Sequence, residues 1–122
     1  MVKVMVLLHR LPGTTREAFR AYYEDHHAPL IQRLAPMIAD YRRNYVGDVL
    51  NRPRGGNEPG FDAATQLTFN SEADHQAFKD QIADPAVIAE IRADEANFLD
   101  HTRTWRFVVD EQVSAAGLEA RP

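Results

Sequence analysis

The chain has 122 residues, a formal net charge of -4, a hydrophobic fraction of 44% and no cysteine. The length predicts one domain, and the lack of cysteine excludes disulfides, thiol nucleophiles and thiolate metal sites. The basic residues are scattered, which argues against nucleic-acid binding, and no apolar run approaches a membrane span. The short apolar run after Lys3 lacks a cleavage site of small residues, so we expect a cytoplasmic protein without a signal peptide.

The first strand is predicted over residues 2–9, where apolar side chains occupy both faces as in a central strand. Thr14 and Glu17 have the spacing of a capping box, which predicts a helix beginning at about residue 15. The helix is expected to reach residue 28, with a continuation to Leu34 left open.

The segment Tyr22–Leu30 (YYEDHHAPL) is the most informative stretch of the chain. On a helix, Tyr23, His26, His27 and Leu30 lie in or beside the apolar stripe that faces the core. The two histidines therefore either border a pocket or are satisfied core residues, and the sequence favours neither.

Pro29 lacks an N–H group, so it is expected to bend the helix and to deprive the carbonyl of Asp25 of its partner. The residue before a proline is biased away from helical angles, which predicts a non-helical Ala28. A bend beside buried imidazoles is a place where a pocket can form.

The rest of the chain predicts three more strands and two more helices. The strands are expected over residues 39–50, 62–69 and 102–109, and the helices begin after Ser71 and at Asp84-Pro85. Residues 51–61 are rich in Gly, Pro and Asn and are predicted to be a loop, either a lid over a pocket or a simple connector.

This order of elements predicts an α+β, ferredoxin-like βαββαβ fold, an antiparallel sheet with helices on one face. Residues 1–110 form the domain and residues 111–122 a C-terminal tail. The open sheet face is expected to be rich in apolar and aromatic side chains. Because such a patch is too large to leave in water, we expect a homodimer whose sheets face each other.

The residue types favour acid–base chemistry. Neither a serine nucleophile constellation nor a metal-binding spacing is visible, and adjacent His26 and His27 diverge by about 100° on a helix, which disfavours one shared metal. An imidazole in a mostly apolar pocket stays neutral and can accept a proton. Tyrosines could orient a carbonyl or hydroxyl substrate, and such a site needs no cofactor.

The sequence resembles the EthD family of the dimeric α/β-barrel class. The matching elements are Phe19-x-x-Tyr22-Tyr23-x-x-x-His27-Ala28-Pro29-Leu30, then Tyr41-x-x-Asn44, and then Glu95-x-x-Phe98-x-Asp100. The resemblance implies a homodimer whose facing sheets form a barrel, with a ligand cavity between sheet and helices near His27. Some relatives accompany an ether-degrading oxygenase, and fungal relatives are dehydratases or decarboxylases of aromatic polyketides. The family often has a histidine where this chain has Tyr45.

We therefore expect a cofactor-independent lyase or isomerase that acts on a small apolar or aromatic, polyketide-like carbonyl compound. His27 and Tyr41 are the predicted catalytic residues. The predicted substrate-binding residues are Tyr23, His26, Tyr45, Leu30 and Trp105. The alternatives are a haem- or oxygen-using oxidoreductase of the same barrel class, or a non-catalytic accessory protein of an oxygenase or degradation pathway.

Overall fold

Four strands form one antiparallel sheet in the computed structural model, which describes residues 1–114. The strands are β1 (Val2–Leu8), β2 (Asp40–Tyr45), β3 (Ala63–Phe69) and β4 (Trp105–Val109). Their order in the sheet is β2-β3-β1-β4, and all three neighbouring pairs are antiparallel. The predicted ferredoxin-like α+β fold is confirmed.

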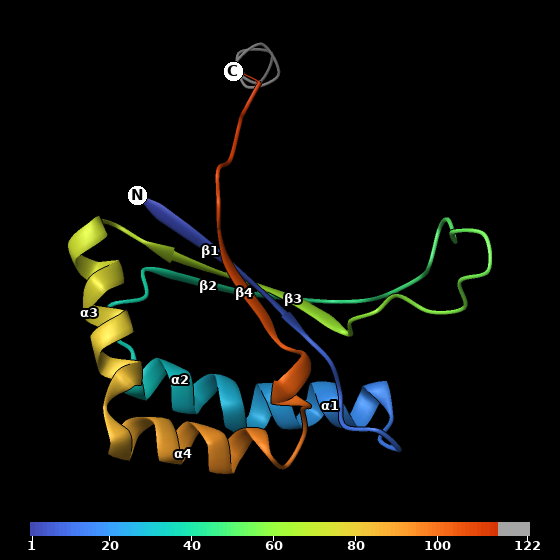
Figure 1. Cartoon of the computed structure of the whole chain (residues 1–122), viewed down its shortest axis with the longest axis horizontal. Coiled ribbons are helices and arrows are strands. Elements are labelled where there is room, and N and C mark those ends of the chain that lie inside the picture. The colour runs from blue at the N-terminus through green and yellow to red at the C-terminus, as the bar shows by residue number, and fades with distance from the viewer. Residues whose placement is uncertain (115–122) are drawn as a thin grey trace.

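The helices lie on one face of this sheet (Figure 1). The first helical arm runs without interruption from α1 (Arg16–Tyr22) through the π-helical turn η1 (Tyr23–His27) into α2 (Ala28–Leu34). The second contains α3 (Glu72–Ala83) and α4 (Pro85–Glu95), and the short 3₁₀ turn η2 (His101–Arg103) precedes β4. None of the helices within residues 1–114 has both the length and the hydrophobicity to cross a bilayer.

Side chains cap the starts of three α-helices, namely α1, α3 and α4. Ser71 and Asp84 cap α3 and α4 as predicted, because their side-chain oxygens accept hydrogen bonds from backbone N–H groups of the first turn. The predicted cap at Thr14 is wrong. Thr15 caps α1 by accepting from the N–H of Ala18 at 3.0 Å, while the hydroxyl of Thr14 donates to the carbonyl of Leu11 and closes the preceding turn.

The prediction for Ala28 is also wrong, because its backbone is helical, with φ -61° and ψ -46°. Pro29 lies in the first turn of α2 but within a continuous helix, so its missing N–H group removes one hydrogen bond to the preceding turn. The change in the helix lies one turn earlier, where the N–H of Ala28 donates to the carbonyl of Tyr23, five residues back. The proline therefore starts a new α-helical segment directly after a wider π-turn.

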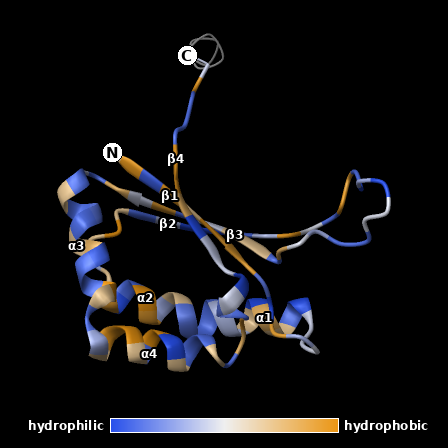
Figure 2. Cartoon of the chain, in the orientation of Figure 1, coloured by the Kyte–Doolittle hydropathy of each residue, from blue (hydrophilic) through white to orange (hydrophobic). Residues whose placement is uncertain are grey.

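The core fills the space between the sheet and the helices. Its largest fully buried side chains are Phe19, Tyr23, Thr65, Phe69, Phe98 and Leu99. Figure 2 shows hydrophobic residues along α2 and α4, two of the helices that lie beneath the sheet in this view. On β1, alternate residues such as Val2 and Val4 are buried in this core.

The opposite face of the sheet is divided into an apolar and a polar half. Met5 and Leu7 of β1 pair with Phe107 and Trp105 of β4, and the two aromatic side chains remain 41% and 66% exposed. On the same face, β2 and β3 present mainly polar residues: Asp40, Arg42, Asn44, Gln66 and Thr68. The apolar surface predicted for this face is thus confined to the β1–β4 half.

The loop between β2 and β3 extends away from the sheet and helices (Figure 1). Strand β2 ends at Tyr45, earlier than predicted, and the chain returns to the sheet at Ala63. Of the predicted tail, residues 115–122 lie outside the part of the chain that the structure describes.

Candidate active site

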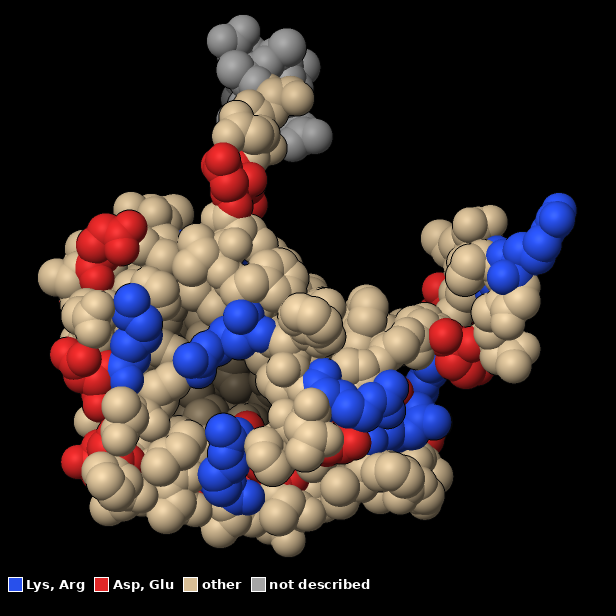
Figure 3. All heavy atoms as spheres, viewed as in Figure 1, with Lys and Arg blue, Asp and Glu red and all other residues tan. Residues whose placement is uncertain are grey.

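A cavity of about 410 Å³ lies between the sheet and the helices. Figure 3 shows a hollow at this position, with basic side chains on either side of its mouth. Part of its wall is apolar and comes from α2, α3 and α4, through Ile31, Phe78, Ile82, Ile88 and Ile91. Its size and mixed lining are those of a small-molecule site.

His27 lines this cavity and is buried, with 5% of its surface exposed. Its Nδ1 atom lies 2.8 Å from Oδ2 of Asp94, which comes from α4. Among residues 1–114, no side chain or backbone group forms a hydrogen bond with the second ring nitrogen, Nε2. An ionised carboxylate can only accept, so it holds the imidazole proton on Nδ1 and leaves a lone pair on Nε2.

The Asp94 carboxylate is itself held in place. Its Oδ1 atom accepts a hydrogen bond of 2.8 Å from the hydroxyl of Tyr22, which in turn accepts one of 2.9 Å from the amide of Asn97. Burial, followed by the hydrogen bond to Asp94, raises the pKa of the Tyr22 hydroxyl. Both carboxylate oxygens therefore have a donor, which fixes the orientation of the His27 ring.

Three hydroxyl groups line the cavity as a connected cluster. The hydroxyl of Tyr41 donates to that of Tyr23 at 3.1 Å, and the Tyr23 oxygen lies 2.8 Å from Oγ1 of Thr65. Burial raises the pKa of both tyrosines, so their hydroxyls stay protonated. Two hydrogen bonds use two of the three hydroxyl protons, which leaves one proton for a ligand oxygen.

A second polar network lies beside the cavity. Arg43 on β2 donates two hydrogen bonds of 2.8 Å to Glu24 on η1, and the hydroxyl of Tyr45 also donates to this carboxylate. The hydrogen bonds from Arg43 lower the pKa of Glu24 to about 2. The network ties the π-turn to strand β2.

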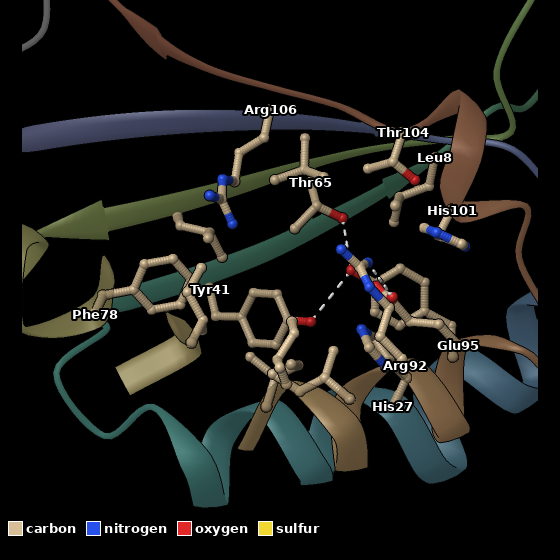
Figure 4. A pocket seen from close by; sticks show the side chains of 17 residues that line it. Leu8, His27, Tyr41, Thr65, Phe78, Arg92, Glu95, His101, Thr104 and Arg106 are labelled. Carbon is tan, nitrogen blue, oxygen red and sulfur yellow. Dashed lines mark hydrogen bonds and ion pairs between the residues drawn. The ribbon is translucent and has the colours of Figure 1, made fainter. Parts of the chain in front are cut away.

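The structure brings three of the predicted site residues together in the cavity wall. They are Tyr23, His27 and Tyr41 (Figure 4). Because they come from η1 and β2, they meet where the helical arm crosses the sheet. Their roles in binding and catalysis stay predictions.

The other four predicted residues do not line the cavity: His26, Leu30, Tyr45 and Trp105. His26 is exposed, because one residue along a helix changes direction by about 100°, and its ring lies tilted against that of Tyr22, with 4.6 Å between centroids. Ile31 occupies the place in the wall expected of Leu30, and Trp105 lies on the opposite face of the sheet.

Sequence reasoning missed Asp94, Thr65 and the cationic part of the cavity, which includes Arg92 and Arg106. Asp94 had a detectable signal, because it lies three residues after Ile91 on the inward side of a predicted helix. A carboxylate on an apolar stripe indicates a buried partner. Within residues 1–114, no group of three His, Asp or Glu side chains is placed to hold a metal ion.

Comparison with known proteins places the chain in a family. Similar solved structures include an EthD-like protein from Ralstonia eutropha, 26% identical with a TM-score of 0.58, which covers 93% of this chain and 92% of that chain. An EthD family protein from Bacillus halodurans is 19% identical, with a TM-score of 0.61 and coverage of 92% and 100%. SnoaB from Streptomyces nogalater, a cofactor-independent oxygenase, is 12% identical, with a TM-score of 0.57 and coverage of 93% and 94%. A search of curated proteins found no match. A model of the EthD domain matches residues 11–102, most of the chain, and the protein therefore belongs to the EthD family.

Proposed function

We propose that the protein is a cofactor-independent lyase or isomerase in which His27 transfers a proton to or from a small carbonyl compound. The observation that carries this proposal is the hydrogen bond of 2.8 Å between His27 and Asp94, which leaves the other ring nitrogen without a partner among residues 1–114. A carboxylate that orients an imidazole beside a substrate cavity is an arrangement that supports general base catalysis.

In the proposed reaction, Nε2 of His27 removes a proton from the carbon next to the substrate carbonyl. Negative charge then develops on the carbonyl oxygen, and a hydroxyl of the Tyr23–Tyr41–Thr65 cluster donates a hydrogen bond to it. Asp94 stabilises the imidazolium that forms. Return of the proton to another carbon gives isomerisation, and return to a leaving hydroxyl gives dehydration.

The cavity supports a substrate with an apolar or aromatic body. Isoleucines and Phe78 form much of its wall, and its volume of about 410 Å³ suits a molecule of one or two rings. We propose no cofactor, because the proton transfer requires only these side chains.

The test is hydrogen exchange at the carbon next to a carbonyl. In deuterated water, the purified protein is given 2-tetralone and any ligand identified by mass spectrometry after purification, and ¹H NMR follows loss of the α-proton signals. We expect His27→Gln to slow the protein-dependent exchange by about 10²- to 10⁴-fold. His26→Gln alters the exposed neighbour and is the matched control. Equal exchange by the wild type and His27→Gln would contradict the proposal.

A second candidate is an oxygenase that needs no cofactor, suggested by the shared fold with SnoaB. The carbanion formed by the same proton transfer would then react with dioxygen. An oxygen electrode distinguishes the two, because a lyase or isomerase consumes no oxygen during turnover. If substrate binds but neither reaction occurs, the protein is an accessory binding protein.

We also propose a homodimer formed through the open face of the sheet. The support is the apolar surface of the β1–β4 half, where Trp105 and Phe107 remain exposed in the single chain. Contiguous apolar surface of this kind is typical of protein interfaces.

A further inference from the structure

Arg106 is a basic side chain of the cavity without an acidic partner. Its guanidinium forms no hydrogen bond or ion pair with the rest of residues 1–114, and its nearest aromatic neighbour is Phe78, 5.9 Å from Cζ to the ring centroid. Several other arginines are paired with carboxylates, such as Arg43 with Glu24. Arg106 is exposed as a whole residue. Partial burial of its guanidinium and the charge of Arg92 lower its pKa, and the charge of Glu95 offsets part of this effect, but a guanidinium stays protonated at neutral pH. An anion would compensate this charge.

Thr104 provides a second polar group without a partner. Its Oγ1 atom is buried and has no hydrogen-bond partner among residues 1–114. Thr104 lies two residues before Arg106 on an extended segment, so both side chains project to the same face of the sheet and line the cavity. A buried hydroxyl without a partner is unfavourable, and a ligand oxygen within reach would satisfy it.

Arg106 is the charged side chain of the cavity wall that has no ion-pair partner within residues 1–114. Arg92 and Glu95 neutralise each other through an ion pair of 2.8 Å. His27 is paired with Asp94, and His101 also lies in the wall. The Asp94 carboxylate lies behind His27 and not in the cavity wall, so beside β4 the unpaired guanidinium of Arg106 favours an anionic group over a neutral one.

We propose that Arg106 and Thr104 bind the carboxylate group of the substrate. The substrate would then be an aromatic or apolar carboxylic acid that also carries the carbonyl group, and this inference rests on the proposed function of the same cavity. The guanidinium supplies two parallel N–H donors that match a carboxylate, and the threonine supplies a hydroxyl donor.

The arrangement of the side chains fits this assignment. Figure 4 shows Arg106 and Thr104 on the sheet side of the cavity and His27 on the helix side. A substrate held by its carboxylate at β4 would direct its opposite side toward the imidazole. Its apolar body would lie against Ile31, Ile88 and Ile91.

The test compares two probes of the same shape, 2-naphthoate and its neutral isostere 2-naphthamide, by isothermal titration calorimetry. We expect the wild type to bind the carboxylate about 10- to 100-fold more tightly than the amide, the range for charge-assisted hydrogen bonds. Arg106→Gln should abolish this preference, Arg106→Lys should retain part of it, and Thr104→Val should weaken naphthoate binding several-fold.

Two controls separate this proposal from its alternatives. Arg54→Gln removes a positive charge from the exposed loop and should retain the full preference. His27→Gln should also retain it, so loss of proton exchange in that variant reports on the proposed reaction and not on carboxylate binding. Thermal unfolding followed by circular dichroism verifies that each variant is folded. A wild type without a preference, or an Arg106→Gln variant that keeps it, would overturn the proposal.

Discussion

At the scale of single residues, the cavity depends on partners that are far apart in sequence. Asp94 orients His27 from 67 residues away and reaches it from a different helix. The hydroxyl of Tyr22 donates to the same carboxylate and accepts a hydrogen bond from the amide of Asn97. The imidazole therefore has one defined tautomer and one defined direction, which a surface histidine lacks.

Replacement of Asp94 by Asn tests this orienting role. The amide has nearly the same shape, so we expect a folded protein, but it can donate a proton to Nδ1 and so favour the wrong tautomer of His27. Turnover should fall by about 10- to 1000-fold, while binding of the neutral probe 2-naphthamide should change little.

The matched control is Asp80→Asn, which alters an exposed carboxylate on α3. ¹⁵N NMR of the imidazole nitrogens distinguishes the tautomers directly. If Asp94→Asn retained the tautomer and full turnover, Asp94 would have only a structural role.

The sequence predicted those residues of the site that lie in a recognisable local pattern. Tyr23 and His27 were found because they lie on the apolar stripe of one helix, and Tyr41 because the element Tyr41-x-x-Asn44 resembles the EthD family. Arg106 and Asp94 were missed, because an arginine on an edge strand and a carboxylate on a helix are usually solvated. Only the folded arrangement shows that Arg106 lines the cavity and that Asp94 binds the imidazole of His27, which also lines it.

At the scale of elements, the sequence predicted a bend of the helix at Pro29, and the structure has the π-turn η1 shortly before this proline. A proline predicts a disturbance of the preceding turn, but it does not determine whether the helix bends or widens. In the structure, the helix continues through the wider turn, and Tyr23 and His27 both remain buried. The helix caps were easier to predict, because Ser71 and Asp84 act on adjacent backbone groups.

The network of Glu24, Arg43 and Tyr45 joins η1 to β2, and it predicts a pH-dependent stability. Glu24 has its pKa lowered from 4.5 to about 2 by the hydrogen bonds from Arg43. A lowered pKa means that the carboxylate stabilises the folded state fully above pH 4.5 and loses this effect as the pH falls toward 2. Because the side chain is 37% exposed, we expect a contribution of about 1 kcal/mol to the free energy of unfolding.

Urea unfolding at a series of pH values below 5 measures this contribution. Glu24→Gln should be less stable than the wild type near neutral pH, and the difference should shrink in acid. Glu90→Gln disrupts an exposed ion pair with Arg33 and should change stability by less than about 0.5 kcal/mol. A wild type and Glu24→Gln with parallel pH profiles would contradict the prediction.

At the scale of the whole molecule, the order of elements determined most of what could be predicted. A chain with the element order strand, helix, strand, strand, helix, strand can place its strands in only a few ways within one sheet, because crossover connections are right-handed. The observed strand order, β2-β3-β1-β4, is one of them. The division of the open sheet face into an apolar half and a polar half was harder to predict, because it depends on which strands pair with each other. Trp105 lies beside Leu7 only because β4 pairs with β1.

The proposed homodimer follows from this face and gives the last prediction. Trp105 is 66% exposed, so Trp105→Glu should leave the fold of the single chain intact while it places a charge in the proposed interface. In a dimer with two-fold symmetry, the substitution occurs on both sides of the contact. Loss of a central aromatic anchor costs about 2 kcal/mol or more on each side, so we expect dissociation to be favoured by about a thousandfold.

Sedimentation velocity at micromolar concentration measures the outcome. The wild type should sediment as a dimer and Trp105→Glu as a monomer with an unchanged circular dichroism spectrum. Leu50→Glu makes a similar change at a 94% exposed position in the loop between β2 and β3, and it should remain dimeric. A monomeric wild type would remove the proposed interface, and a dimeric Trp105→Glu would place the contact on another surface.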